Sequence, residues 1–511
     1  MNTRGGLLVA SWGNPFSWNR VHYIIDNLKI TSLTSTEAII QARKPARVLI
    51  IGVDTFAQTS PIERNNDQKH CKGYRKLGRI DPGAFKDYQS YLDCVKCKME
   101  AWIRLCSSID SDTLSKLLDR GVLDVFIAPG MGSFSNVDHK GDEGINPLET
   151  LKSMVLIRIL KELLRVGGPL IVDVTHGINY LTMIMHEASV TAAKIYSAST
   201  LQKLDIEILN SEPYPQPRPA KPPTLNVHRV ASRTIDPIGE EGYSIINELI
   251  AVRSSLDGKR GFYIESTRLK PEDKKELGKS MGMVRREYNA IYKNGIVALN
   301  ILAYTLPLAL IYFAAENKGK LGNARAIDNA IDLAMRIVNG VLGRTVVTST
   351  SILHRVAVNH GEVEKLLVLA SLQDAIIQIA LGNLEEIPTL EELNNRGIPL
   401  ETLENIAKTI NLPTTELTVH EISLIKKNVI KERRSDYIPV EEGRWPDNMP
   451  DIPNERNYKA HGGFERNTVQ AMLYGEELYL RYNPAALKDN RKTWNSTWEY
   501  IKESILSGSR R

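Results

Sequence analysis

A polar stretch near the C-terminus, Asn454 to Gly463, places an arginine, an asparagine and a histidine within a few residues of one another. Arg456 carries a guanidinium that is always charged and can donate two parallel hydrogen bonds to phosphate oxygens. His461 has the side chain whose ordinary pKa suits proton transfer near neutrality. The amphipathic run from Phe464 to Tyr482 predicts a helix whose N-terminus would add backbone N–H donors. The stretch therefore predicts a phosphate site.

The same spacing of arginine and histidine occurs at two other places, which are Arg64 with His70 and Arg355 with His360. The first pair falls in a polar loop, and the second falls in an apolar helical pattern. Asn457, which directly follows Arg456, supplies an amide that can hold a phosphate or fix an imidazole. Context therefore favours Arg456, Asn457 and His461 as the candidate catalytic residues.

Little in the sequence indicates a metal or a cofactor. A metal-dependent nuclease would need clustered carboxylates, and beside Arg456 only Glu455 is acidic. No GxGxxG or P-loop pattern supports NAD, FAD or ATP hydrolysis. The cysteines, which are Cys71, Cys94, Cys97 and Cys106, include a CxxC, but three fall in one helical pattern. Buried thiols or one disulfide are favoured over zinc.

Length and composition set the general class. A chain of 511 residues can form at least two domains. Its net charge of +5 neither indicates nor opposes a polyanionic partner. Few cysteines and no signal peptide ahead of Gly6 predict a cytoplasmic protein. The apolar run Gly295–Ala315 is long enough to cross a membrane, but Asn300 and Pro307 interrupt it, so a buried helix is favoured.

The first two hundred residues alternate short apolar runs with longer helical patterns. Strands are expected at Gly6–Ser11, Val48–Val53, Leu123–Ala128, Leu170–Val174 and Leu204–Leu209. Helices are expected at Trp18–Leu28, Phe85–Cys106, Leu148–Arg165 and Ile178–Ser197. Such a pattern predicts an α/β fold with a Rossmann-like parallel sheet covered on both faces, whose ligands bind beyond the carboxyl ends of the strands.

Four loops follow these strands and carry glycine, aromatic and small polar residues. Glycine permits close approach, an aromatic ring offers a face to a base, and hydroxyl and amide groups donate or accept. Each residue alone also fits a structural role, such as packing by a tryptophan, so the argument rests on the loops meeting at one edge. The candidate nucleotide-binding residues are Gly13, Asn14, Trp18, Asp54, Gly130, Met131, Gly132, Ser133, Thr175, His176, Gly177 and Asn179.

The second half of the sequence is expected to be all-α. Prolines alternate with polar residues from Pro213 to Pro223 and mark a boundary. Two helices, Tyr243–Ser254 and Pro271–Tyr288, follow in a connecting segment with a possible helix-turn-helix-like piece. From Tyr288 the pattern is almost wholly helical, over Ala290–Asn317, Ala324–Leu342, Val363–Ile379, Leu403–Ile410 and the run after Phe464.

Two loops resemble those of a known family. WGNPxxW at Trp12–Trp18 and DVTHGIN at Asp173–Asn179 look like the CARF domain of the CRISPR-associated CARF and HEPN ribonucleases, ancillary effectors of type III CRISPR systems. The sequence RNxxAHxG at Arg456–Gly463 resembles the HEPN motif of the same family. The resemblance implies a CARF sensor at residues 1–212, a linker at 213–287 and a HEPN-like ribonuclease domain at 288–511.

The resemblance also implies a function. A homodimer, with larger homo-oligomers left open, would bind a cyclic oligoadenylate across its axis, usually the cyclic tetra-adenylate. Six candidates would line that ring, namely Gly13, Asn14, Trp18, Thr175, His176 and Asn179, whereas Asp54 and Gly130 to Ser133 are assigned by their place on the rim. Paired motifs would cleave single-stranded RNA without metal, by attack of the 2′-hydroxyl on the neighbouring phosphorus.

Two alternatives remain open from the sequence. The chain could be a ligand-responsive regulator that binds DNA through the basic segment Arg268–Arg286 and has no nuclease activity. The sensor half could also degrade its own cyclic messenger, which is compatible with the ribonuclease hypothesis.

Overall fold

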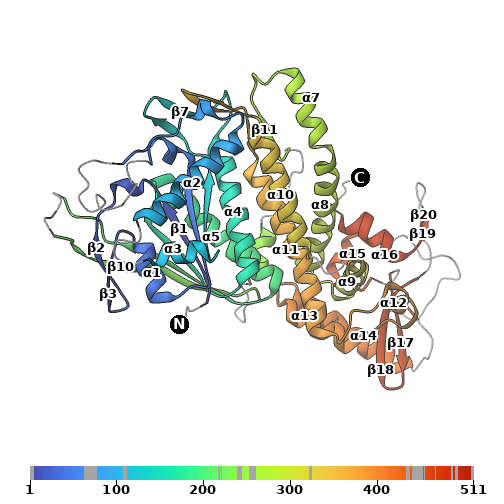
Figure 1. Cartoon of the computed structure of the whole chain (residues 1–511). Helices are drawn as coiled ribbons and strands as arrows, with labels where there is room; N and C mark the ends of the chain where they lie inside the picture. Colours follow the sequence, from blue (N-terminus) through green and yellow to red (C-terminus); the bar gives the residue numbers. More distant parts are fainter. Residues whose placement is uncertain are drawn as a thin grey trace.

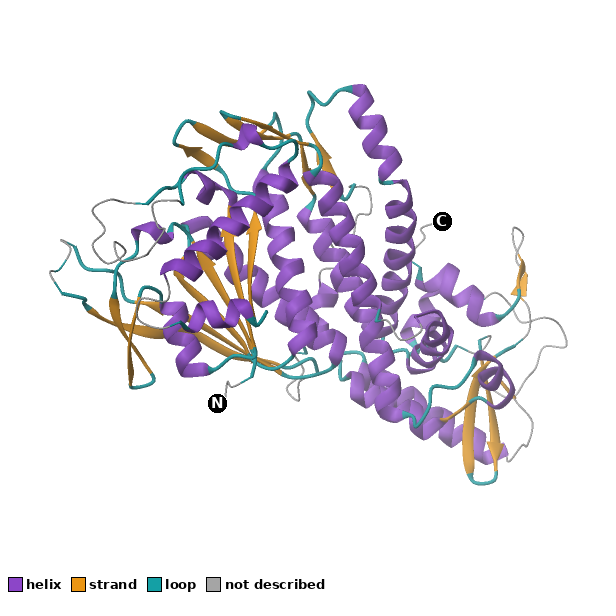
Figure 2. Cartoon of the chain, in the orientation of Figure 1, coloured by secondary structure: helices purple, strands orange, loops and turns teal. Residues whose placement is uncertain are grey.

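The computed structural model of the chain describes residues 5–61, 77–106, 112–216, 219, 221–238, 244–251, 261–321, 325–432, 438–439, 453, 455–465, 468–484, 487–488 and 493–507. Arg64, His70 and Cys71 lie outside these residues. Strands gather at one end of the molecule, long helices fill its middle, and a hairpin lies at the other end (Figure 2).

An eight-stranded sheet with strand order β3-β2-β10-β9-β8-β1-β4-β5 forms the N-terminal core. Strands β9, β8, β1, β4 and β5 are mutually parallel and confirm the five predicted strands. Their bounds are β1 Leu7–Trp12, β4 Arg47–Val53, β5 Leu123–Ala128, β8 Leu170–His176 and β9 Leu204–Ser211. The apolar side chains of β1 and β4 are all buried, as expected for strands covered on both faces.

Helices cover both faces of this sheet (Figure 1). Helices α1 Ser35–Arg43, α2 Tyr88–Cys106 and α3 Thr113–Asp119 lie on one face, and α4 Pro147–Val166 and α5 Asn179–Thr200 lie on the other. Three of the predicted helices are thus confirmed as α2, α4 and α5. The bounds of α4 follow from its sequence, because Asn146 accepts a hydrogen bond from the backbone N–H of Leu148, Pro147 opens the helix, and Gly167 ends it at φ 65°.

The helix predicted at Trp18–Leu28 is wrong, because this segment forms a β-hairpin. Strands β2 Val21–Ile25 and β3 Leu28–Ser32 are antiparallel and are joined at Asp26 and Asn27, both with positive φ. Burial in β2 alternates residue by residue, which is a strand period and not a helical one. The pair Asp-Asn tolerates the left-handed conformation that a tight hairpin turn requires.

The proline-rich segment joins two strands of the same sheet. β10 Thr224–Ile235 pairs antiparallel with β9 and, over Thr224–Asn226, parallel with β2. The sheet therefore extends beyond the boundary expected at residue 212.

A helical body packs against α4 and α5 of the N-terminal part (Figure 1). It contains α6 Ile245–Ala251, α7 Pro271–Ser280, α8 Gly282–Ala303, α9 Pro307–Leu321, α10 Ala326–Leu342 and α11 His360–Asn383. The helix expected at Ala290–Asn317 divides into α8 and α9, because Thr305 has φ 48° and Pro307 opens the next helix. One residue, Met281, separates α7 from α8, which is shorter than the turn of a helix-turn-helix motif.

A second sheet joins the two halves of the chain. Its strand order is β12-β13-β7-β6, with bounds β6 Gly132–Phe134, β7 Val137–Gly141, β12 Thr345–Thr348 and β13 Ser351–His354. β7 and β13 are parallel, so Ser351 faces Asp138 and His354 faces Gly141. β14 Val356–Val358 follows and pairs with β11 Tyr263–Glu265. The helical pattern expected around Arg355 is therefore wrong, because Arg355 lies between two strands.

The C-terminal part combines helices with a hairpin. Its helices are α12 Leu390–Arg396, α13 Leu400–Ile410, α14 Thr415–Glu432, α15 Glu455–Ala460 and α16 Thr497–Tyr500, and α16 continues into the π-helix Ile501–Leu506. Its strands are β15 Ile398–Pro399, β16 Ile438–Pro439, β17 Val469–Tyr474, β18 Glu477–Tyr482, β19 Leu487–Lys488 and β20 Thr493–Trp494.

The helix predicted at Phe464–Tyr482 is also wrong, because β17 and β18 form an antiparallel hairpin there. Gly475, at φ 65°, provides the turn. In β18, Leu478, Leu480 and Tyr482 recur at a spacing of two and are buried. This spacing is the period of a strand, so the apolar residues of the run are compatible with a strand as well as with a helix. The phosphate site expected before Phe464 therefore lacks the backbone N–H donors that a helix starting there would have supplied.

The described residues contain one helix, α11, that is long and apolar enough to cross a membrane, and 72% of its apolar window is buried inside the protein. The run Gly295–Ala315 is interrupted between α8 and α9. α11 packs against α8, α5 and α10, as a core helix does.

Candidate functional site

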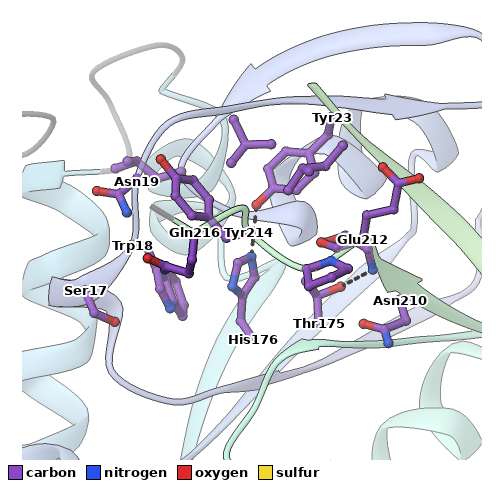
Figure 3. A pocket seen from close by; sticks show the side chains of 15 residues that line it. Ser17, Trp18, Asn19, Tyr23, Thr175, His176, Asn210, Glu212, Tyr214 and Gln216 are labelled. Atoms are coloured by element: carbon purple, nitrogen blue, oxygen red, sulfur yellow. Dashed lines mark hydrogen bonds between the residues drawn. The ribbon is translucent and has the colours of Figure 1, made fainter. Parts of the chain in front are cut away.

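A cavity of about 450 Å³ opens at the carboxyl end of the parallel strands, beside the β2–β3 hairpin. Figure 3 shows its lining, in which the side chains come from the loop after β1, from β2, from the end of β8 and from the segment after β9. Residues that line it include Trp18, Tyr23, Thr175, His176, Glu212 and Tyr214. It lies where an open α/β sheet binds ligands.

His176 is held in one tautomer inside this cavity. Its Nε2 accepts a hydrogen bond from the backbone N–H of Ser35 at 3.1 Å and lies 3.2 Å from the hydroxyl of Tyr23. A backbone N–H can only donate, so Nε2 carries no hydrogen and Nδ1 carries it. Burial lowers the pKa of His176 to about 4, which keeps the ring neutral near pH 7. The imidazole can therefore donate through Nδ1.

Buried Asp173 fixes the loop that carries His176 and Thr175. Its carboxylate accepts from the hydroxyls of Ser35 and Thr36 and from the backbone N–H of Thr175. Since these partners come from α1 and from β8 itself, Asp173 ties the first helix to the edge of the cavity. Its role is to position the loop, because it is fully paired and 1% exposed.

Three predicted ligand residues, Trp18, Thr175 and His176, line the cavity. The ring of Trp18 lies 4.4 Å from that of His176 and edge-on to Trp12 and Trp102, so this tryptophan joins the cavity to the core. Thr175 accepts from the backbone N–H of Ser211 at 3.1 Å, which binds β8 to the end of β9.

Other predicted residues adjoin the cavity without lining it. The backbone N–H of Gly13 donates to the carbonyl of His176 at 2.8 Å, and Asn14 caps the short helix Pro15–Ser17. A Cβ on Gly177 would lie 2.2 Å from Oγ1 of Thr182, so close packing requires glycine there. Asn179 is exposed at the start of α5. A contact of these residues with ligand stays a prediction.

The structure places Asp54 and the loop after β5 in a separate buried cluster. Asp54 accepts from the backbone N–H of Gly130 at 2.7 Å and from the hydroxyl of Tyr88 at 2.8 Å, and it pairs with His139. Burial alone would raise the pKa of Asp54, but His139 and the other partners outweigh it and lower the pKa.

The rest of that loop is more exposed. The backbone N–H of Met131 donates to the hydroxyl of Tyr180, Gly132 has φ 128°, and Ser133 donates to Asp138. None of Asp54, Gly130, Met131, Gly132 and Ser133 lines the cavity beside His176. Their contact with ligand likewise stays a prediction.

Sequence reasoning missed Tyr23, Glu212 and Tyr214. The helix predicted over Trp18–Leu28 does not direct Tyr23 to the cavity, whereas strand β2 does. The dipeptide Asp26-Asn27 is the sequence signal that could have indicated a hairpin there. Glu212 directly precedes the proline-rich segment and Tyr214 lies at its start. Nothing in the sequence of that segment predicts that the chain turns back to the sheet.

A second group of candidate residues lies in and around the RNxxAHxG segment. Arg456 lies in the short helix α15, and His461 follows it, with half of its side chain exposed. Nδ1 of His461 lies 3.0 Å from Oε1 of Glu421, which α14 carries. A carboxylate can only accept here, so Nδ1 carries a hydrogen and Nε2 is left for another partner. Sequence spacing could not reveal Glu421, because forty residues separate the pair.

The segment is anchored from both sides. Tyr458 is fully buried, with its hydroxyl 2.6 Å from that of Tyr482 on β18. Gly462 and Gly463 have φ 59° and 84°, and a Cβ on Gly462 would lie 2.6 Å from Oγ1 of Thr418 on α14. The turn after His461 therefore requires glycine, and it packs His461 against the helix that carries Glu421. The described part of Asn457 is its backbone alone.

The alternative pair with the same spacing, Arg355 and His360, does not form one site, because the two side chains contact different partners. Arg355 lies 3.8 Å from Asp273, and Nδ1 of His360 lies 3.2 Å from the hydroxyl of Ser153. Cys94, Cys97 and Cys106 are free thiols on α2. In the described ranges, no group of three or more His, Cys, Asp or Glu is arranged to hold a metal ion.

Two comparisons with known proteins describe what the N-terminal part and the chain as a whole are similar to. Residues 7–213 match the family model described as the CARF domain of CRISPR system endoribonuclease Csx1. The whole chain is similar to a CRISPR system endoribonuclease Csx1 from Methanocaldococcus jannaschii, with 23% identity over 508 residues, covering 93% of this chain and 91% of the relative.

Proposed function

Because this chain is a CARF-containing ancillary ribonuclease of type III CRISPR systems, we propose that it cleaves single-stranded RNA internally when a cyclic oligoadenylate binds its N-terminal domain. Cyclic tetra-adenylate is the first candidate for that messenger. The observation that carries the catalytic half of the proposal is the hydrogen bond between His461 and Glu421. His461 directly precedes the glycine turn and is close in sequence to Arg456.

The cavity beside His176 supports the sensor half of the proposal. Trp18 and Tyr214 offer aromatic surface, and Asn210 and Gln216 offer amide donors and acceptors. Neutral His176 offers one N–H from Nδ1. These groups suit adenine and ribose. A cyclic messenger is larger than one such cavity, which suits a ligand shared by two copies of the domain across a dimer axis.

Arg456 and His461 supply the two things that cleavage needs. The 2′-oxygen attacks the adjacent phosphorus, so an O–P bond forms while the bond to the 5′-oxygen breaks. Nε2 of His461 takes the 2′-hydroxyl proton, and Arg456 stabilises the charge that grows on the phosphate oxygens. Asn457 is assigned to hold the scissile phosphate. The products are a 2′,3′-cyclic phosphate and a 5′-hydroxyl, and no step uses a metal.

Glu421 acts as a positioning residue in this mechanism. By accepting from Nδ1 it orients the ring and leaves Nε2 unprotonated in the neutral imidazole, which is the form that can take a proton.

A single arginine and histidine make a sparse site, so we assign catalysis to a homodimer in which two copies of the motif face each other. Arg456 is exposed and His461 is half-exposed, which leaves the pair open to approach by a second copy. A second imidazole would then protonate the leaving 5′-oxygen.

The test is RNA cleavage by the full-length protein, with and without cyclic tri-, tetra- and hexa-adenylate, and with and without EDTA. We expect cleavage with one ring size, retained in EDTA and lost in His461→Ala. Loss of cleavage on chelation, full cleavage by His461→Ala, or cleavage indifferent to every ring would each contradict the proposal.

Among the residues that the structure describes, the contacts of the basic segment Arg268–Arg286 do not favour the DNA-binding regulator. In the segment Arg268–Arg286 the basic residues are interleaved with Glu272, Asp273 and Glu276, and Arg268 itself pairs with Glu143.

A further inference from the structure

A second cavity, of about 370 Å³, opens directly beside the RNxxAHxG segment. Arg456, Lys459, Ala460 and Gly462 form one side of it. Tyr304, at the end of α8, and Leu417, on α14, form the other side. The walls of this cavity come from three distant parts of the chain, so sequence spacing alone does not reveal it.

The floor of the cavity is rigid and already hydrogen-bonded within the protein. Thr305 has φ 48°, and its hydroxyl lies 2.6 Å from that of Thr414. Its carbonyl accepts from the hydroxyl of Thr418 at 3.0 Å, and Thr418 also touches the turn at Gly462. These bonds lock the end of α8, the start of α14 and the catalytic segment together, so the cavity is preformed.

The walls are mostly apolar, with positive charge at one side. Leu417 is 60% exposed and Tyr304 is half-buried, so both present apolar surface to the cavity. Lys459 holds the tyrosine in place, since its Nζ lies 5.2 Å from the ring centre and 2.6 Å from Oε1 of Glu455. An aromatic and aliphatic slot next to an arginine fits a flat ring that is linked to a phosphate.

We propose that this cavity binds the base of the nucleotide next to the scissile phosphate of single-stranded RNA, with the base against Tyr304 and Leu417. This inference rests on the proposed ribonuclease function and adds a base subsite to it. Arg456 spans the two sites, because it belongs to the motif and also lines the cavity. The subsite holds the strand so that the adjacent phosphate reaches His461.

The test separates binding from cleavage. The full-length His461→Ala protein, with cyclic tetra-adenylate present, is titrated with fluorescent RNA oligonucleotides that are intact or carry one abasic nucleotide at successive positions. We expect one abasic position to weaken binding roughly tenfold, the scale of one lost base–aromatic stack. In the same His461→Ala background, Tyr304→Leu or Leu417→Ser should weaken binding of intact RNA. Either substitution should cause little further loss with the RNA that is abasic at the sensitive position, because the base that the side chain contacts is already missing.

Tyr474→Leu is the matched control, since Tyr474 is 67% exposed at the end of β17 and is not among the residues that line the cavity, so this change should leave binding unaltered. Leu417→Ser keeps the test valid if Tyr304→Leu folds poorly, because its side chain is largely in solvent. Equal binding at every abasic position, or losses that add fully between the RNA change and the protein change, would overturn the subsite. Failure of the parent protein to cleave RNA would instead overturn the proposed function, whatever the binding result.

Discussion

Nδ1 of His139 lies 3.2 Å from Oδ1 of Asp54, and neither side chain is exposed. Asp54 follows β4 of the N-terminal sheet, whereas His139 lies on β7 of the sheet that joins the two halves. Tyr88 donates to Asp54, and its ring stands edge-on to His354 of β13 at 5.2 Å. A buried polar cluster thus connects the rim of the first sheet to the C-terminal half.

The cluster should be essential to stability. Asp54→Ala leaves the backbone N–H of Gly130, the hydroxyl of Tyr88 and the ring of His139 without their buried acceptor. We expect a loss of about 2–6 kcal/mol in the free energy of unfolding, because two buried donors, the N–H of Gly130 and the hydroxyl of Tyr88, lose their acceptor at about 1–3 kcal/mol each. Urea denaturation measures it. Asp93→Ala, an exposed aspartate on α2, should change stability by less than about 0.5 kcal/mol, and equal effects of the two substitutions would refute this role.

Acid should destabilise the protein in part through His354. Burial lowers its pKa to about 4, Asp54 opposes that effect and His139 adds to it. The unfolded value is about 6.5, so its contribution to stability is complete above pH 6.5 and is lost as pH falls through 4. The full difference corresponds to about 3 kcal/mol.

The measurement compares denaturation at pH 7.5 and pH 4.5 for the parent protein and His354→Gln. The variant should lose less stability between the two pH values. Burial raises the pKa of Asp374 to about 7, so this residue makes the protein more stable as the pH falls. Its contribution is the same in both proteins and therefore cancels when they are compared. His420→Gln, at an exposed position, should keep the parent's dependence. A parent-like dependence in His354→Gln would show that this histidine does not titrate as described.

Glu421 should affect turnover and not RNA binding. Glu421→Gln keeps an acceptor for Nδ1 but removes the charge, and Glu421→Ala removes both. We expect kcat to fall about tenfold in the first and up to about a hundredfold in the second, with KM unchanged. The pH–rate profile should change shape, which a general loss of folded protein would not cause. Glu416→Ala, an exposed position on the same helix, is the control, and a rise in KM at constant kcat would remove Glu421 from the mechanism.

Asn210 should contribute to messenger binding. Asn210→Ala removes one exposed amide from the lining of the cavity beside His176, and we expect the affinity for cyclic tetra-adenylate to fall by about 1 kcal/mol, or roughly fivefold. Isothermal titration calorimetry measures the affinity. RNA cleavage should need more messenger and still reach the same rate at saturation. Asn405→Ala, exposed on α13, should bind as the parent does; an unchanged affinity in Asn210→Ala would place the ligand elsewhere.

The sequence predicts the buried strands well and the exposed hairpins poorly. β1, β4 and β8 are nearly continuous apolar runs, and only burial on both faces explains such runs. In Val21–Ile25 and Glu477–Tyr482, apolar residues alternate over few positions, and there a helical period fits almost as well. The difference at Phe464–Tyr482 affects the expected chemistry, because a helix there would add backbone N–H donors beside Arg456 and His461, whereas the observed hairpin adds none.

Half of each site was visible from the sequence because it lies in one continuous motif. Thr175 and His176 stand in DVTHGIN, and Arg456 and His461 stand in RNxxAHxG. Tyr23 and Glu421 complete the two sites through tertiary contacts that no spacing encodes.

The parallel pairing of β7 with β13 brings together residues about 210 positions apart. This sheet cannot be completed during synthesis until residue 354 has left the ribosome, so its closure is a late, non-local step of folding. A fragment that ends near residue 212 would expose the open edge of β7 and the faces of α4 and α5 that α10 and α11 cover. Such an isolated N-terminal fragment would therefore be prone to aggregation.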